Sequence, residues 1–214
     1  MLKIDFVSDV SCPWCAVGLA ALEEALRRVG PDVQAELHFQ PFELNPKMPP
    51  GGQDITEHLT QKYGSTPEQQ VAGREAIRER GAALGFTFRQ EGRGRIYNTF
   101  NAHRLLHWAG FEGPRPQLAL KKALLEAYFT DGQSPEDTDV LVQAALKAGL
   151  DPERAREILR GNDYASEVRE QEQFYVDQGI HAVPSVIIND RHLIQGGQPP
   201  EAFEQALRQL LTEV

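Results

Sequence analysis

The sequence has few cysteines: only two occur among its 214 residues, and both lie in Cys12-Pro13-Trp14-Cys15. A framework of structural disulfides needs more cysteines, spread along the chain, so the sequence excludes a disulfide-stabilised scaffold. One CxxC pair in a chain of this length instead indicates redox or metal chemistry.

Long apolar runs are also absent. The longest contain a few residues, whereas a membrane-spanning helix needs about 20. The N-terminal stretch Met1–Phe6 carries an aspartate at position 5 and no apolar segment of signal-peptide length. We therefore expect no membrane partner and a cytoplasmic location.

Positive charge is scarce as well: 22 lysines and arginines stand against 31 aspartates and glutamates, for a formal net charge of -9. The basic residues are scattered rather than clustered. Because nucleic acids are polyanions, we expect no nucleic-acid partner. The length fits one large domain, or one domain that carries an insertion.

The first residues show a strand–helix–strand pattern. Residues 2–8 and 33–42 alternate between apolar and polar side chains, which indicates strands. Residues 13–29 between them have helical periodicity, with a proline in the first turn and Gly30-Pro31 at the end. This order predicts a βαβ unit.

A long block from Ile55 to about Tyr164 is helical in pattern, and no strand period appears in it. The expected helices cover residues 54–63, 67–84, 98–110, 114–130, 137–148 and 151–160. Proline-containing signatures at 66–69, 134–137 and 151–153 predict helix starts. A Pro/Gly-rich stretch at 45–52 precedes the block and indicates a boundary.

The C-terminal part returns to a mixed pattern. A helix at 163–178 is followed by strands at 183–188 and 192–194, which make a hairpin across Asn189-Asp190, and by a helix from 199 to 211. We expect an α/β fold with a four-stranded mixed sheet. Its N-terminal part is residues 1–50, its all-helical insertion 51–165 and its C-terminal part 166–214.

The CxxC pair lies where a thiolate is stabilised. Cys12 precedes the first turn of a predicted helix, whose free N–H groups and dipole favour an anion. The thiolate is the attacking species in disulfide exchange. We predict Cys12 as the exposed attacking thiol and Cys15 as the shielded resolving thiol. Pro13 and Trp14 are expected to tune the redox potential.

Half of a zinc site is the alternative for the CxxC pair. Structural zinc needs four ligands, and His103 and His107 could complete a Cys2His2 set from a predicted helix. However, an isolated HxxxH spacing is more often coincidental, and no second cysteine pair exists. We expect no metal and no bound cofactor.

Several segments resemble one known family. Residues 8–15, SDVSCPWC, resemble the active-site entry of the DsbA-like thioredoxin family, specifically its FrnE-like branch. Segments 98–105, 128–132, 183–185 and 196–199 resemble further motifs of that branch, in the same order. The resemblance therefore spans nearly the whole chain, which is more specific than CxxC alone.

This resemblance implies a thioredoxin fold with a helical insertion and a cis Val183–Pro184 bond facing the CxxC pair. Val183 would then offer its backbone to an extended substrate peptide. Alternatively, Pro184 simply begins an edge strand. His181 lies either near Cys12, stabilising its thiolate, or in a solvated loop.

For two other residues, two structural or functional roles are open. Asn98 and His103 either line a substrate groove between the helical block and the sheet, or cap and pair helices inside the block. Sequence alone does not place them relative to the thiols.

The expected function is thiol–disulfide oxidoreduction of protein or small-molecule disulfides, with a cellular thiol reductant or oxidant for recycling. One alternative is a glutathione-dependent isomerase or transferase of the 2-hydroxychromene-2-carboxylate isomerase or kappa type. Cys15 argues against it, because a resolving thiol would eject bound glutathione. Another alternative is a nonenzymatic binder with an apolar groove near Trp14. The direction of electron flow stays open.

Overall fold

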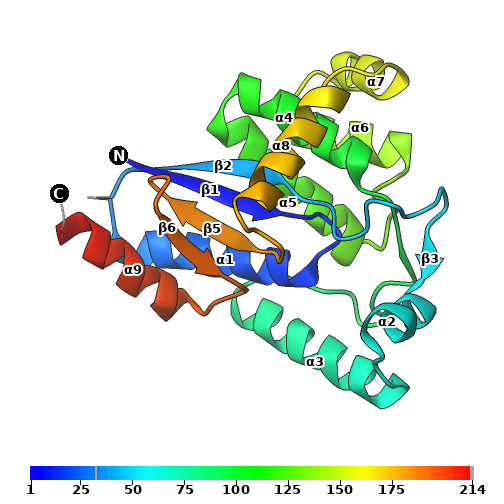
Figure 1. Ribbon diagram of the computed structural model, residues 1–214, viewed down its shortest axis with the longest axis horizontal. Coiled ribbons are helices and arrows are strands. Elements are labelled where there is room, and N and C mark those ends of the chain that lie inside the picture. The colour runs from blue at the N-terminus through cyan, green and yellow to red at the C-terminus, as the bar shows by residue number, and fades with distance from the viewer. Residues whose placement is uncertain (32, 213–214) are drawn as a thin grey trace.

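A four-stranded mixed sheet in the order β2-β1-β5-β6 lies at the centre of the molecule (Figure 1). The computed structural model describes residues 1–31 and 33–212. The strands are β1 Leu2–Ser8, β2 Ala35–Pro41, β5 Ser185–Ile188 and β6 His192–Gln195. β1 runs parallel to β2 and antiparallel to β5, and β5 pairs antiparallel with β6. This sheet confirms the expected four-stranded mixed topology.

Each face of the sheet packs against different helices. Helices α1, Pro13–Val29, and α9, Pro200–Thr212, run along one face, as Figure 1 shows. Ile4 and Phe6 of β1 are fully buried in the cluster that these helices form. The next residue, Val7, packs with Tyr175 of α8, Ala165–Asp177. The alternation of side chains along a strand produces these two layers.

The central block contains six helices within the described residues: α2 Ile55–Tyr63, α3 Pro67–Ala83, α4 Phe100–Glu112, α5 Pro114–Phe129, α6 Thr138–Lys147 and α7 Pro152–Arg160. Helices α4 to α7 form a second buried cluster, and α4 and α5 contact β2. Helix α3 instead packs against α1. The proposed domain boundaries after residues 50 and 165 stay a prediction. In residues 1–31 and 33–212, no helix is both long and apolar enough to cross a bilayer.

One strand pair inside the block was not expected. β3, Gln53–Asp54, and β4, Arg95–Ile96, pair antiparallel over two residues each. Strands this short cannot show an alternating pattern, so the sequence analysis missed them. Gly52 permits the pairing, because a Cβ there would lie 2.0 Å from the Ile96 carbonyl oxygen.

Helix starts agree with two of the three signatures. Thr66 forms a capping box with Gln69 at the start of α3, and Asp151 caps α7. The prediction from the remaining signature, at residues 134–137, was wrong in position. Helix α6 begins at Thr138 with Asp137 as its N-cap, so Ser134-Pro135 lies in the preceding turn.

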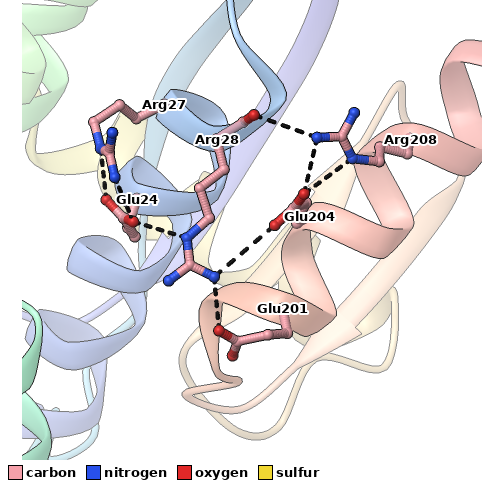
Figure 2. A network of polar contacts seen from close by, with 6 residues as sticks. All are labelled: Glu24, Arg27, Arg28, Glu201, Glu204 and Arg208. Atoms are coloured by element: carbon pink, nitrogen blue, oxygen red, sulfur yellow. Dashed lines mark hydrogen bonds and ion pairs between the residues drawn. The ribbon is translucent and has the colours of Figure 1, made fainter.

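A surface ion-pair network joins the C-terminal end of α1 to α9 (Figure 2). Arg28 contacts Glu24 of its own helix and Glu201 and Glu204 of α9. Arg208 of α9 donates to the Arg28 carbonyl oxygen. The network links helices that are distant in sequence, at the end of α1 remote from the CxxC pair.

Candidate active site

The two cysteines lie at the N-terminal end of α1. Cys12 is the N-cap residue in extended conformation, Pro13 is the first helical residue, and the Cys15 N–H donates to the Cys12 carbonyl over 3.1 Å. Both are free thiols. The expectation of an exposed Cys12 was wrong: only 4% of its surface is exposed, and Cys15 is fully buried. The chain packs over Cys12, which lines a cavity that is partly open to solvent.

The two thiols have opposite pKa shifts. A hydrogen bond from the Cys15 thiol lowers the pKa of Cys12, and the positive charge of Arg93 lowers it further. Burial and the negative charge of Asp9 raise this pKa, but their effect is smaller. Burial raises the pKa of Cys15 well above its usual value, and its interaction with the Cys12 thiolate adds to the rise. Cys12 is therefore the thiol that ionises first, while Cys15 keeps its proton.

A loop remote in sequence lies directly against Cys12. The Val183–Pro184 peptide bond is cis, and Cys12 Sγ lies 3.7 Å from the Val183 carbonyl oxygen, within hydrogen-bonding reach. Gly18 of α1 allows Pro184 to pack closely, because a Cβ at position 18 would lie 3.0 Å from Pro184 Cγ. The fold thus brings together residues 171 positions apart.

A cavity of about 750 Å³ opens beside Cys12. Pro13, Trp14, Val183 and His181 line it together with the cysteine. His181 is exposed and lines this cavity, but among the described residues the hydrogen bond of Cys12 Sγ goes to Val183, not to His181. Trp14 is half-buried, and the guanidinium of Arg80 lies over its ring at 5.2 Å.

The cavity is basic although the chain as a whole is acidic. One carboxylate, that of the buried Glu43, lines the cavity. Four cationic side chains line it as well: Lys62, Arg74, Arg89 and Arg93. Apolar side chains such as Phe88 and Phe129 form part of the remaining wall. A site of this kind suits a ligand with both an anionic group and an apolar part.

Asn98 and His103 lie outside the lining of this cavity. Asn98 accepts a hydrogen bond from the Phe100 N–H at the start of α4 and donates to the Met48 carbonyl. The His103 side chain is buried, with Nε2 3.4 Å from Asp9 Oδ1. Asn98 thus bonds at the start of α4, as the structural alternative expects, whereas His103 lies against the loop between β1 and α1, outside the helical block.

Asp9 holds the loop that presents Cys12. Its buried carboxylate accepts hydrogen bonds from the Ser11 N–H, the Ser11 hydroxyl and the Leu44 N–H. Burial raises the pKa of Asp9, but the partners His103, Leu44 and Thr99 outweigh burial and lower it to about 2. Asp9 is therefore an ionised anchor for the segment between β1 and α1.

The HxxxH pair does not extend the CxxC site. His103 faces Asp9, whereas His107 Nδ1 lies 3.1 Å from Gln171 Oε1 on α8. Over the described parts of the chain, no group of three or more His, Cys, Asp or Glu side chains is arranged to hold a metal ion.

Sequence reasoning missed Arg93. This residue donates to the Ser11 carbonyl over 2.8 Å, and its guanidinium lies 5.5 Å from the centroid of the Phe129 ring. Its charge helps to lower the pKa of Cys12. Arg93 lies in a loop with other arginines nearby, and no spacing rule links it to the CxxC pair 78 or more residues earlier.

Replacing Arg93 with methionine is expected to slow alkylation of Cys12 at neutral pH several-fold. Removal of the nearby positive charge raises the pKa of the thiol and so lowers its thiolate fraction. The measurement is the rate of iodoacetamide labelling against pH. Arg89→Met is the matched control, because Arg89 lines the same cavity. Equal profiles for wild type and Arg93→Met would contradict the role.

Comparison with known proteins identifies similar chains. A probable DsbA oxidoreductase from Streptomyces coelicolor is 36% identical, with a TM-score of 0.91 over 100% of this chain and 92% of that one. The uncharacterised protein YwbO of Bacillus subtilis is 29% identical over 96% of each chain. The cytosolic disulfide reductase DsbM from Pseudomonas aeruginosa, solved with GSH, shares the fold at 14% identity and a TM-score of 0.66, over 98% of this chain and 99% of that one.

The family comparison covers almost the whole chain. Residues 3–208 match the DSBA-like thioredoxin domain. This range includes the CxxC pair, the central helical block and the Val183–Pro184 loop. The sheet topology and the paired cysteines agree with that match, and the chain therefore belongs to the DSBA-like thioredoxin domain family.

Proposed function

We propose that this chain is a thiol–disulfide oxidoreductase that works by dithiol–disulfide exchange between Cys12 and Cys15. The observation that carries the proposal is the pairing of the two thiols at the start of α1. Cys12 receives a hydrogen bond from Cys15, which lowers its pKa, while burial keeps Cys15 protonated. An acidic attacking thiol beside a protected second thiol is the arrangement that two-step exchange requires.

The proposed reaction has two displacements. The Cys12 thiolate attacks one sulfur of a substrate disulfide, forming a mixed disulfide and releasing the other sulfur as a thiolate. Cys15 then attacks Cys12 Sγ, forming the Cys12–Cys15 disulfide and releasing the second substrate sulfur. The dithiol is oxidised as the substrate disulfide is reduced. A cellular thiol returns the pair to its starting state, and the same steps run in reverse for an oxidase.

Two features of the cavity suggest what the substrate looks like. Val183 borders Cys12, where the backbone of an extended peptide could align beside it. The excess of cationic side chains on the wall favours acidic peptides or an anionic low-molecular-weight thiol. Glutathione is such a thiol, and the structure of DsbM was solved with it. We propose glutathione or a similar thiol as the recycling partner.

The cytoplasm is the proposed location. Cytosolic thiols are kept reduced, and DsbM is described as a cytosolic reductase. Recovery of the protein mainly from an extracytoplasmic fraction would contradict this placement. Assignment to the FrnE-like branch is likewise a proposal, supported by the motifs in the sequence.

Insulin reduction by dithiothreitol tests the proposed function. The wild-type protein is expected to accelerate precipitation of the insulin B chain, because it cycles between dithiol and disulfide. The control is the double variant Cys12→Ser/Cys15→Ser, which should match the uncatalysed rate. If the wild type is no faster than this variant, dithiol–disulfide exchange is not the activity.

A glutathione-dependent isomerase or transferase is the second possibility, and the large basic cavity beside Cys12 favours it. Such an enzyme needs one nucleophilic or thiol-positioning group and no resolving thiol. Cys15→Ser would then keep full activity in a glutathione-dependent product assay. Loss of a disulfide-exchange activity in the same variant supports the oxidoreductase instead.

A further inference from the structure

A lysine is buried near the two cysteines without a hydrogen-bonding partner. Lys121 of α5 is 0% exposed, and its Nζ has no hydrogen-bond partner in the described structure. Isolated burial of an ammonium group costs several kcal/mol, so such a lysine tends to lose its proton or to have a negative neighbour. A position this unfavourable points to a role beyond packing.

The geometry of α5 directs Lys121 into the protein interior. Residues four positions apart lie on the same face of a helix. Gln117, one turn before Lys121, bonds to the backbone of Phe39 in β2. Leu125, one turn after it, packs in the same buried cluster as Cys15. Lys121 therefore lies on the face of α5 that packs against β2 and the buried cluster containing Cys15.

The next residue, Lys122, links α5 to α1 at the surface. Lys122 reaches across the surface to Glu23 of α1, with its Nζ 2.9 Å from Glu23 Oε1. The two lysines thus lie at the same junction between α5 and α1, one buried and one exposed. This neighbour provides a matched control for experiments on Lys121.

The charged groups around Lys121 are those of the active site. Burial lowers the pKa of Lys121, whereas the negative forms of Cys15, Asp9 and Cys12 raise it. Asp9 is itself paired with His103 of α4. Asp9 stays ionised, so the change that Lys121 experiences during a reaction comes from the two thiols.

We propose that Lys121 accepts the proton of Cys15 when Cys15 displaces the substrate from Cys12, a role that rests on the proposed function. Within the part of the chain that the structure describes, Lys121 Nζ has no hydrogen-bond partner in the dithiol form; in the mixed disulfide, its amine turns to the Cys15 thiol, takes the proton and becomes an ammonium. The Cys15 thiolate attacks Cys12 Sγ. The Cys12–Cys15 bond forms as the bond to the substrate sulfur breaks, and that sulfur departs as a thiolate with the electron pair. Lys121 then releases its proton to solvent.

Thionitrobenzoate release separates the two displacements. One equivalent of 5,5′-dithiobis(2-nitrobenzoic acid) gives a first release when Cys12 attacks and a second when Cys15 resolves the adduct. Lys121→Met is expected to slow the second release about 100-fold at pH 7, the scale of one positioned general base. The first release changes much less. The defect shrinks as pH rises, because hydroxide then removes the Cys15 proton.

Lys122→Met is the control and should leave both releases at wild-type rates. A second release from Lys121→Met with the wild-type rate and pH profile would overturn the role of Lys121. Absence of a second release from the wild-type protein would instead overturn the proposed dithiol mechanism. The two failures are therefore distinguishable.

A measurement on the wild-type protein tests the proposal even if the Lys121→Met variant does not fold. The ¹³Cε chemical shift of Lys121 can be titrated in the reduced and the oxidised protein. Lys121 should keep its proton to higher pH in the reduced protein, where thiolates face it, than in the disulfide form. Identical titrations in both forms would overturn the proposal.

Discussion

Replacing Cys15 with serine is expected to convert the protein into a trap that holds its substrate on Cys12. The Cys12 thiolate still attacks a disulfide, but a serine hydroxyl cannot displace the sulfur that is captured. Insulin reduction should fall below about 1% of the wild-type rate, as expected when one member of a reacting pair is removed. Intact mass spectrometry after exposure to oxidised glutathione should show one adduct per chain.

The same experiment on Cys12→Ser gives the opposite result. This variant lacks the acidic thiol, so it should show neither turnover nor an adduct, because burial keeps the remaining Cys15 protonated. Retention of wild-type activity by both single variants would refute the two-step mechanism. An adduct on Cys15 in Cys12→Ser would reverse the assignment of attacking and resolving thiols.

Asp9→Ala is expected to destabilise the protein by about 3 kcal/mol at pH 7, the scale for leaving buried hydrogen-bond donors without a partner. The carboxylate is fully buried and accepts hydrogen bonds from Ser11 and Leu44. Its removal leaves these donors without their acceptor. Urea unfolding measures the change. Glu23→Ala is the control, because its exposed pair with Lys122 should contribute about 0–1 kcal/mol.

Acid should reduce the difference between wild type and Asp9→Ala. The pKa of Asp9 falls from 3.8 to about 2 on folding, so the ionised carboxylate stabilises the folded state above pH 3.8. This contribution, about 2 kcal/mol, is lost as pH falls from near 4 to near 2. A stability difference that stays constant over that window would contradict the assigned ionisation of Asp9.

The elements with strong local signals could be predicted from the sequence. Helix α1 begins at Pro13 and ends at Val29, with Gly30 as its C-cap, as expected, because proline in the first turn and a terminal glycine act locally. The hairpin between β5 and β6 turns at Asn189 and Asp190, which both adopt positive φ. Such turns favour these residue types, so the hairpin was predictable.

The chemical environment of Cys12 could not be predicted in the same way. Arg93, Asp9 and Lys121 act on the thiols through space, and no spacing along the chain relates them. The burial of Cys12 was missed for the same reason, since the segments that enclose it are distant in sequence. Helix periodicity indicates that a face is buried, but not which partner covers it.

By itself, the sequence determined the order of the helices and of the four strands of the main sheet, the family resemblance and the presence of a paired thiol at the start of a helix. These properties depend on neighbouring residues and on regular spacing. Tertiary structure decided that Cys12 lines a basic cavity, that Val183 lies against the Cys12 sulfur, and that Lys121 is buried near Cys15. Those properties depend on Coulomb forces and exclusion of water between segments that only folding brings together.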